Sequence, residues 1–201
     1  MKKVQSIEGL RGVAVLLVVL FHISDDLVPF GFVGVDVFMV ISGFVIAKSV
    51  LSRHSSGEKF LVSKFFFRRM RRLYPPMFFT ALVMLPILAL TQSPLGAFDN
   101  SFKTALASLA GLSNGVIQYL NGGYFGDDAK LNGYLHSWSL SVEIQFYALF
   151  AILAWFALSN LRSSADGIRT LKALLSVVTA VSLLVMILST VYTLPYQELG
   201  I

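Results

Sequence analysis

Two basic side chains near the start of the chain, Arg11 and His22, lie eleven residues apart. In an α-helix this separation is three full turns plus about 20°, so both side chains share one helix face, about 16 Å apart along the axis. A neutral imidazole is cheaper to bury than a carboxylate and accepts a proton from a hydroxyl group. The spacing therefore indicates His22 as a candidate general base, with Arg11 on the same face.

A second pair of ionisable side chains, His136 and Glu143, lies seven residues apart within a later apolar segment. On one helix these side chains would share a face about 10 Å apart, with Ser139 between them. A desolvated glutamate is expected to stay protonated or to pair with a histidine. The spacing predicts that His136 and Glu143 meet on one face of a helix.

Asp36 lies in an apolar segment that also holds Gly31, Gly34 and Gly43. We expect the glycines to allow close helix packing. The carboxylate needs a donor, and the available kinds are a hydroxyl, an arginine or His22. In an alternative interpretation, the ionisable groups within the apolar segments only stabilise a helix bundle and take part in no chemistry.

Four arginines, Arg68, Arg69, Arg71 and Arg72, follow three phenylalanines and precede Tyr74-Pro75-Pro76. One interpretation is a cluster that sets membrane orientation and anchors lipid headgroups. The other is a phosphate site, because guanidinium groups bind phosphate oxygens in a bidentate manner and a donor such as acyl-coenzyme A carries several phosphates. Neither a P-loop nor a glycine-rich dinucleotide motif is present as a competing site.

The rest of the residue inventory excludes several kinds of chemistry. The chain has no cysteine, which excludes disulfides, thiolate catalysis and cysteine-ligated metals. Its three histidines are not at ligand spacing, so we expect no bound metal, and no resident cofactor is predicted. A serine nucleophile beside His136 stays open, although no G-x-S-x-G motif accompanies it.

The elements that must position these residues are long apolar helices. Hydrophobic side chains make up 56% of the 201 residues, charged ones 13%, and the mean hydropathy is +0.74, whereas about a quarter of an ordinary soluble domain is charged. About 20 apolar residues cross a bilayer. Five runs are candidate spans, and the sequence predicts an all-α, polytopic transmembrane helix bundle with spans at 12–23, 30–51, 73–91, 135–159 and 171–194.

A sixth apolar run, 104–120, is interrupted by serine, glycine, asparagine and glutamine. Three basic residues precede the first span and seven lie in 52–72, which predicts a cytoplasmic N-terminus and a cytoplasmic second loop. Arg162, Arg169 and Lys172 fit a cytoplasmic loop only if the sixth run does not cross. We therefore predict that 104–120 is re-entrant or interfacial. The net charge of +5 follows from these loops, and no nucleic-acid partner is expected.

Taken together, the motifs resemble the integral-membrane acyltransferase-three family, bacterial enzymes that O-acylate cell-surface polysaccharides. The resemblance runs from Ile7 to about Phe150. It is carried by Ile7-Glu8-Gly9-Leu10-Arg11-Gly12 with Phe21-His22, the segment 31–44, the arginine cluster, Ser113-Asn114, and His-Ser-Trp-Ser-Leu-Ser-Val-Glu-Ile-Gln-Phe-Tyr at 136–147.

The resemblance implies transfer of an acyl group, commonly acetyl, from cytoplasmic acyl-coenzyme A to a hydroxyl of an extracytoplasmic glycan such as lipopolysaccharide. It implies a multi-pass protein of the bacterial inner membrane whose partners are lipids, the donor and the glycan acceptor. The residues carried over by the match are Arg11 and His22 as the essential pair, Arg69 and Arg72 for the donor with Arg68 and Arg71 as the alternative register, Asp36 and Glu143 as polar members of the site, and His136, Trp138 and Ser139 as substrate-binding candidates. His22 would act as a base or carry the acyl group.

The sequence departs from the family pattern in two respects. Ile144 stands where the family commonly has a second glutamate, which leaves Glu143 alone. The family has about ten spans, whereas five or six are expected here, so residues 1–201 resemble the N-terminal part of a membrane acyltransferase domain. Further helices or a partner subunit would then complete the bundle. The alternative function is a non-catalytic membrane module or a transporter-like partner subunit.

Overall fold

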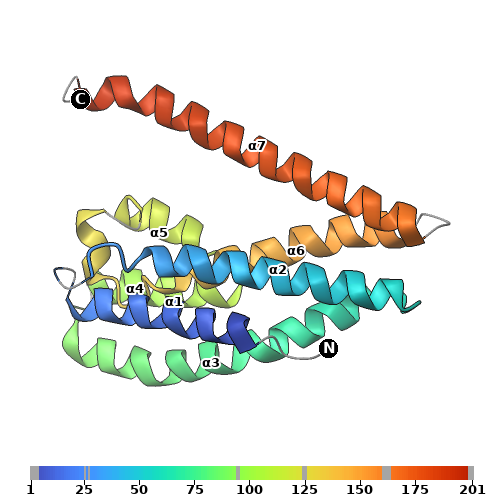
Figure 1. Ribbon diagram of the computed structural model, residues 1–201. Helices are drawn as coiled ribbons and strands as arrows, with labels where there is room; N and C mark the ends of the chain where they lie inside the picture. The colour runs from blue at the N-terminus through green and yellow to red at the C-terminus, as the bar shows by residue number, and fades with distance from the viewer. Residues whose placement is uncertain are drawn as a thin grey trace.

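The computed structural model of the protein describes residues 5–24, 26, 28–93, 96–123, 126–159 and 164–198, and these form helices and their connections without any strand (Figure 1). The elements are α1 (Gln5–Ile23), α2 (Val33–Ser55), α3 (Val62–Thr91), α4 (Ala97–Leu109), α5 (Ser113–Asn121), the 3₁₀ helix η1 (Asp127–Leu131), α6 (Ser137–Ser159) and α7 (Ser164–Glu198). The predicted all-α class is confirmed.

Five of these helices are long and apolar enough to cross a membrane, as the sequence predicts. The candidate spans are Ser6–Ile23, Val33–Ser55, Val62–Thr91, Ser137–Ser159 and Ala165–Thr190. Three of them begin before the apolar run itself. The clearest case is α3, which starts at Val62 because the arginine cluster continues the helical backbone instead of ending it.

The sixth apolar run is broken into two short helices, and neither is among the candidate spans. The chain turns between α4 and α5 at Gly111, whose φ of +70° is a left-handed conformation that favours glycine. A Cβ at Gly111 would also lie 2.8 Å from Cγ2 of Ile144 on α6. The two short helices contact each other and α6. The run 104–120 is therefore not one continuous helix, and its re-entrant or interfacial position stays a prediction.

The centre of the bundle is α6, which contacts α2, α3, α4, α5 and α7. Small side chains at Ala151, Ala154 and Ala157 are fully buried and let neighbouring helices approach closely. Phe150 on α6 stacks on Phe65 of α3 with ring centroids 5.8 Å apart. The first part of α7 packs on α6, and the rest diverges from the bundle (Figure 1). Most apolar side chains between Val177 and Leu188 are exposed.

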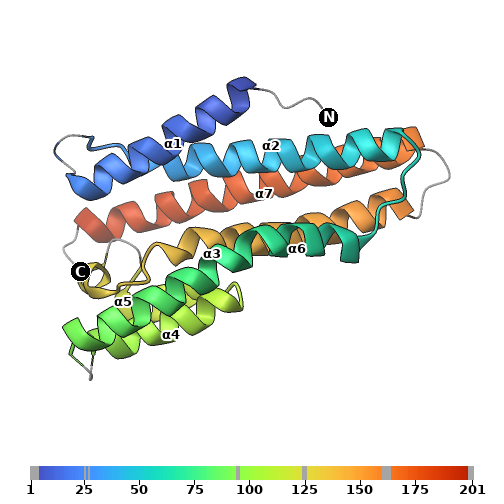
Figure 2. The same cartoon turned by 90° about the horizontal axis from the view of Figure 1, so that it is seen from below.

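The third helix bends where Pro75 and Pro76 interrupt its hydrogen-bond ladder (Figure 2). Its first half carries Phe65 against α6, whereas its second half packs on α4 through Leu88 and Ala105. One helix therefore joins two parts of the bundle.

Close packing of α1 on α2 depends on glycine, as the sequence predicts. A Cβ at Gly34 would lie 2.3 Å from the carbonyl oxygen of Ala14, and one at Gly31 would lie 2.4 Å from that of Leu17. Gly43 differs, because a Cβ there would meet only Phe146 at 3.8 Å. Two of the three glycines thus set the approach of these helices.

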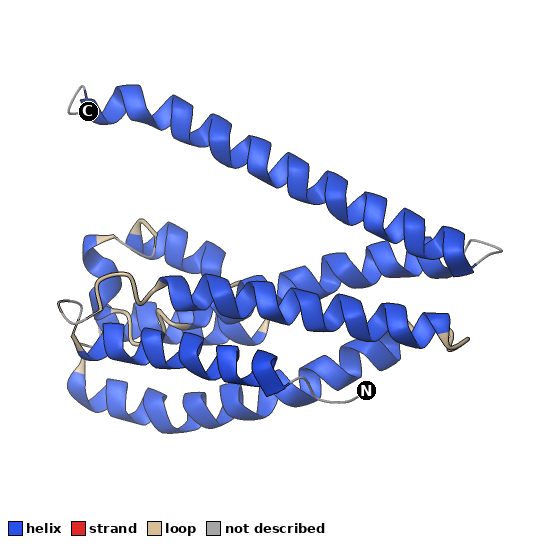
Figure 3. Cartoon of the chain, viewed as in Figure 1, coloured by secondary structure: helices blue, strands red, loops and turns tan. Residues whose placement is uncertain are grey.

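The bundle has two ends, at which different helix termini and connections lie (Figure 3). The connection from α2 to α3 lies at the same end as the C-terminus of α6 and the N-terminus of α7, and we call it the arginine end because the cluster 68–72 lies near it. The connection from α1 to α2, the connection from α3 to α4, and η1 lie at the opposite end, which we call the histidine end. Of the basic residues that predict orientation, Lys2, Lys3 and Arg162 lie outside the described residues.

Candidate active site

Arg11 faces α2 rather than the outside of the bundle. Its Nη2 atom donates a hydrogen bond of 3.4 Å to Oγ of Ser42, and its guanidinium lies 5.6 Å from the ring centroid of Phe38. The Nε atom of Arg11 is buried and has no hydrogen-bond partner in the part of the chain that the structure describes. The arginine thus links α1 to α2 near the middle of both helices.

His22 lies in the last turn of α1 with a defined tautomer. Its Nδ1 atom is 2.8 Å from the carbonyl oxygen of Val18. Because a carbonyl oxygen only accepts, Nδ1 must carry the hydrogen, and Nε2 of the neutral ring then holds the lone pair. A free Nε2 is what a general base or an acyl-accepting nitrogen requires.

A cavity of about 720 Å³ opens beside His22 at the histidine end. One wall is the end of α1, and the other belongs to the segment before α6. Its lining residues are Phe21, His22, Ile23, Ser24, Gly126, Lys130, Asn132, Gly133, Leu135 and His136. The fold therefore brings two histidines that are far apart in sequence to one cavity.

Asn132 holds the second wall of this cavity in place. Its side chain is buried and donates hydrogen bonds to Oγ1 of Thr104 at 2.8 Å and to Oδ1 of Asn121 at 3.0 Å. Its own Oδ1 accepts from the backbone N–H of Tyr134 at 3.0 Å. The amide thus ties the segment before α6 to both α4 and α5.

The predicted meeting of His136 and Glu143 on one helix face is wrong. His136 lies in the turn that precedes α6, whereas Glu143 lies inside the helix. The substrate-binding candidates Trp138 and Ser139 lie in the first turn of α6, and Ser139 donates to the carbonyl oxygen of His136 at 3.3 Å. The helix begins at Ser137, so the seven-residue spacing does not apply to these two side chains.

Glu143 pairs with a tyrosine instead of a histidine. The hydroxyl of Tyr147, one turn further along α6, donates to Oε1 of Glu143, and both side chains are buried. The guanidinium of Arg69 lies 5.8 Å from the ring centroid of Tyr147 and 5.6 Å from that of Phe65. Arg69 of α3 and Glu143 of α6 are thus joined through one aromatic side chain.

The four arginines of the cluster do not share one environment. Arg69 is partly buried against the aromatic rings, whereas Arg68, Arg71 and Arg72 are exposed. Cation–π contact holds Arg69 at a fixed depth in the bundle. Among the four, Arg69 has the position in which a bound group would reach the interior.

Asp36 has no donor within the described residues, so the expectation of a hydroxyl, arginine or histidine partner is wrong. The carboxylate is exposed and lies in the first turn of α2. An acidic side chain in the first turn of a helix is favoured by the positive end of the helix dipole. The helix terminus explains this aspartate without a side-chain partner.

Three residues of the site, Tyr147, Ser42 and Asn132, are not predicted from the sequence. Tyr147 lies four residues after Glu143, a spacing that puts both on one helix face and could have suggested the pair. Nothing in the sequence indicates that Ser42 meets Arg11, or that Asn132 supports the cavity wall, because these contacts join separate elements.

Comparison with known proteins shows the family to which this geometry belongs. The family model described as "Acyltransferase domain" matches residues 4–200. The O-acetyltransferase OatA of Staphylococcus aureus is 31% identical over 181 residues, which are 90% of this chain and 29% of that protein. No solved structure matches.

Two further relatives match most of this chain. The peptidoglycan O-acetyltransferase OatA of Listeria monocytogenes is 30% identical over 194 residues, 96% of this chain and 30% of that protein. The putative membrane-bound transacylase BcsY of Komagataeibacter xylinus is 39% identical over 153 residues, 75% of this chain and 37% of that protein. The chain thus spans about a third of the length of these curated relatives. With the family model matching almost its whole length, the chain belongs to the integral-membrane acyltransferase-three family.

Proposed function

We propose that this chain transfers an acyl group, acetyl in the first instance, from acyl-coenzyme A to a hydroxyl of a cell-surface glycan. The observation that carries the proposal is the cavity of about 720 Å³ that holds His22, at the end of the bundle opposite Arg69. The donor binds at the arginine end, and the acceptor binds at the histidine end.

The orientation in the membrane rests on the distribution of basic residues. Seven lie in 52–72, at the arginine end, so this end faces the cytoplasm and the histidine end faces outward. The protein is then a multi-pass protein of the bacterial inner membrane with a cytoplasmic N-terminus. This orientation gives the cytoplasmic donor and the external glycan separate entrances.

Recognition of the donor rests on Arg69, assisted by Arg72 one turn away on α3. Guanidinium groups bind phosphate oxygens through paired hydrogen bonds, and coenzyme A carries phosphates at the end remote from its thioester. The ring of Tyr147 and the buried pair with Glu143 hold Arg69 in a fixed position. A fixed guanidinium loses less side-chain entropy when the donor binds.

Recognition of the acceptor rests on the polar side chains among the residues that line the cavity. Asn132 and Lys130 accompany the two imidazoles, and Gly126 and Gly133 also line the cavity. Hydroxyl-rich ligands need such donors and acceptors. Two of the relatives are named O-acetyltransferases of this kind, and the Listeria protein is named for peptidoglycan, which supports a glycan as the acceptor.

In the proposed reaction, Nε2 of His22 accepts the proton of the acceptor hydroxyl as its oxygen attacks the thioester carbonyl. The new bond is the ester C–O bond, the broken one is C–S, and coenzyme A leaves as a thiolate that takes up a proton. If His22 carries the acyl group first, Nε2 attacks the carbonyl, the C–S bond breaks and coenzyme A leaves as the thiolate. The acceptor hydroxyl then attacks the acyl-imidazole, the C–N bond breaks, and the hydroxyl proton goes to the released Nε2. Arg11 contributes by holding α1 against α2 through Ser42.

The proposal is tested with membranes that hold the full chain, radiolabelled acetyl-coenzyme A and a purified cell-wall glycan. We expect labelled glycan and free coenzyme A to appear together, and His22→Ala to lower both at least 100-fold, as loss of a general base does. His54→Asn is the matched control, because His54 lies in the last turn of α2 at the other end of the bundle. Undiminished transfer by His22→Ala would contradict the role of this histidine.

A further inference from the structure

A second, smaller cavity of about 160 Å³ lies inside the bundle, next to the cavity of His22. Four of its lining residues, Leu73, Pro76, Met77 and Thr80, come from one face of α3 around the proline bend. The remainder are Ser108, Tyr134, His136, Ser137 and Leu140. His136 borders both cavities, so the two adjoin at this residue.

Most hydroxyl groups around the small cavity already donate to backbone carbonyl oxygens. Thr80 donates to Pro76 at 2.8 Å, and Ser108 donates to Ala105 at 2.7 Å. Ser137 donates to the carbonyl oxygen of Tyr134, also at 2.8 Å. These three hydroxyl hydrogens are therefore not available to a ligand.

The hydroxyl of Tyr134 is different. Its side chain is only 2% exposed, yet its Oη atom has no hydrogen-bond partner within the described residues. Burial raises the pKa of Tyr134, so the phenol keeps its proton and remains a donor. Its ring is fixed by stacking on His136, with centroids 5.7 Å apart. A buried donor without an acceptor is costly, and an acceptor atom on a bound ligand would remove that cost.

The size of the cavity limits the ligand. A volume of about 160 Å³ corresponds to roughly five waters, since one water occupies about 30 Å³ in the liquid. A thioester carbonyl with a short acyl chain fits such a space, whereas a long fatty acyl chain does not. Met77, buried at 7% exposure, closes the wall on the side of α3.

The cavity also lies within reach of a donor held at the arginine end. Arg69, Leu73, Met77 and Thr80 follow one another at helical spacing on one face of α3. Along the axis, Met77 is about 12 Å from Arg69. An extended pantetheine arm whose phosphates bind at Arg69 would span this distance, and the cavity it reaches adjoins that of His22 at His136.

We propose that the small cavity binds the acyl end of the donor, that Oη of Tyr134 donates a hydrogen bond to the thioester carbonyl oxygen, and that the cavity restricts transfer to short acyl chains. This inference rests on the proposed function and assigns its donor class. Tyr134 exchanges no proton in the reaction. Its hydrogen bond strengthens as negative charge develops on the carbonyl oxygen.

The first test measures binding to the full chain in detergent of coenzyme A and of its acetonyl thioether, which keeps a carbonyl but cannot transfer. We expect Tyr134→Phe to weaken binding of the acetonyl compound about tenfold and to leave coenzyme A unchanged. The matched control is Tyr74→Phe, because the Tyr74 hydroxyl already donates to Leu109 at 2.9 Å. Equal loss for both ligands, or no loss for either, would overturn the role of Tyr134.

The second test addresses chain length by turnover of acetyl- and butyryl-coenzyme A. Met77→Ala enlarges the cavity, and we expect the ratio of kcat/KM for butyryl over acetyl to rise at least tenfold, within the range that a pocket gains per methylene. If Met77→Ala does not fold, Met77→Val makes the same test with a smaller change of volume. An unchanged ratio would overturn the short-chain restriction.

The two proposals fail in different ways. If the wild-type chain binds the acetonyl compound in a Tyr134-dependent manner but transfers nothing to any glycan, the proposed function is wrong and the acyl-binding cavity stands. If transfer to glycan occurs and Tyr134→Phe binds both ligands as wild type does, the proposed function stands and the cavity assignment is wrong.

Discussion

The arginine end and the histidine end of this bundle are built in opposite ways. At the arginine end, Phe65, Phe150 and Tyr147 pack between α3 and α6, and Arg69 lies over the rings of Phe65 and Tyr147. At the histidine end, a cavity of about 720 Å³ remains open between α1 and the segment before α6. A filled end presents a few fixed groups to a ligand, whereas a hollow end can admit part of a polymer.

The difference follows from how each end is held together. Large aromatic side chains pack together with aliphatic ones at the arginine end, and such packing leaves little space. At the histidine end, backbone and amide hydrogen bonds through Asn132, Ser101 and Ser113 hold short helices and turns around the cavity. Hydrogen bonds fix position with little volume, so the space between the elements stays open.

The largest effect is expected at Arg69. Each charge-assisted hydrogen bond to a phosphate contributes about 1.5–3 kcal/mol, so loss of two in Arg69→Ala should lower kcat/KM for acyl-coenzyme A about 1,000-fold. Arg69→Lys keeps the charge but cannot form two parallel hydrogen bonds, so its kcat/KM should lie between those of wild type and Arg69→Ala. The exposed Arg169→Ala on α7 is the control, and steady-state kinetics with the donor varied is the measurement. Equal effects of Arg69→Ala and Arg169→Ala would remove the distinction between the two ends.

The next largest effect is expected where α1, which carries His22, packs on α2. A Cβ at Gly34 would lie 2.3 Å from a backbone oxygen that cannot move alone. Gly34→Ala must therefore separate the helices, at a cost of about 3 kcal/mol in the free energy of unfolding, the upper part of the usual range for overpacking. Transfer should fall with it, because the position of His22 depends on this contact.

Gly12→Ala is the matched control for the contact at Gly34. Nothing lies within 4 Å of a Cβ at Gly12, and alanine is favoured over glycine in a helix by up to about 1 kcal/mol. Denaturant unfolding in mixed micelles should show Gly12→Ala as stable as wild type or slightly more so. If both variants lose stability alike, close packing at Gly34 is not what holds α1.

A smaller effect is expected at Asn132. Asn132→Ala leaves Thr104 and Asn121 without their shared donor and the N–H of Tyr134 without its acceptor, which should cost about 2 kcal/mol. The KM for the glycan should rise, and the KM for the donor should rise less, because Asn132 lines the glycan cavity and reaches the donor cavity only through the N–H of Tyr134. Gln118→Ala, at an exposed position on α5, should change neither constant. A rise in the donor KM alone would contradict the assignment of this cavity to the acceptor.

The sequence predicts one part of this molecule well, because that part is local. Length and apolar content decide whether a segment can span a bilayer, and both are read from consecutive residues. The interruption of 104–120 is equally local, since Gly111 and its polar neighbours lie within the run. The glycine contacts of α1 with α2 follow in the same way from small residues in an apolar segment.

The candidate site is less predictable, because its contacts join separate elements. His136 would lie on the face of Glu143 if α6 began two residues earlier, but Asn132 holds the preceding turn in another conformation. Glu143 accepts from Tyr147, and the position of Tyr147 depends on Phe65 of α3, which packs against its ring. Asp36 needs no side-chain partner because it lies at a helix N-terminus, and the helix start at Val33 is not evident from the apolar run.

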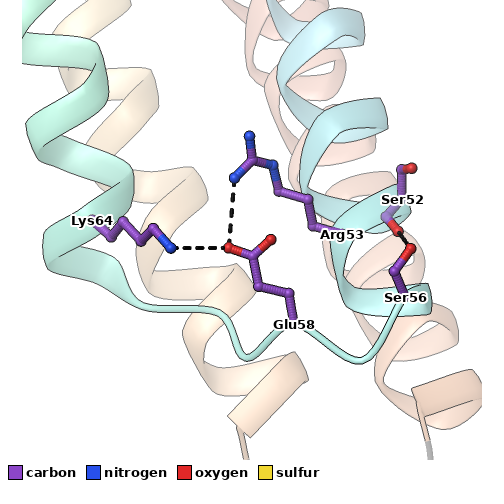
Figure 4. Close-up of polar contacts among 5 residues, drawn as sticks. All are labelled: Ser52, Arg53, Ser56, Glu58 and Lys64. Carbon is purple, nitrogen blue, oxygen red and sulfur yellow. Dashed lines mark hydrogen bonds and ion pairs between the residues drawn. The ribbon is translucent and has the colours of Figure 1, made fainter. Parts of the chain in front are cut away.

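The smallest effect is expected on the surface of the arginine end, where Glu58 accepts from Lys64 at 3.2 Å and lies 3.5 Å from Arg53 (Figure 4). The hydrogen bond from Lys64 holds the pKa of Glu58 below its ordinary value of 4.5. A lowered pKa in the folded state means that Glu58 stabilises the fold above pH 4.5 and loses this contribution as the pH falls through the folded pKa. Glu58→Gln should therefore melt slightly below wild type at pH 7 and together with it at pH 3.

Salt separates this surface pair from the interior of the same end. Exposed charges are screened over about 3 Å at 1 M salt, so the small difference between wild type and Glu58→Gln at pH 7 should vanish there. The difference between wild type and Arg69→Ala should persist at 1 M salt, because it arises from the contact of Arg69 with Tyr147 and, through it, Glu143, and both are buried. If salt abolishes both differences, Arg69 behaves as one more surface charge, and the arginine end offers no fixed group for a donor.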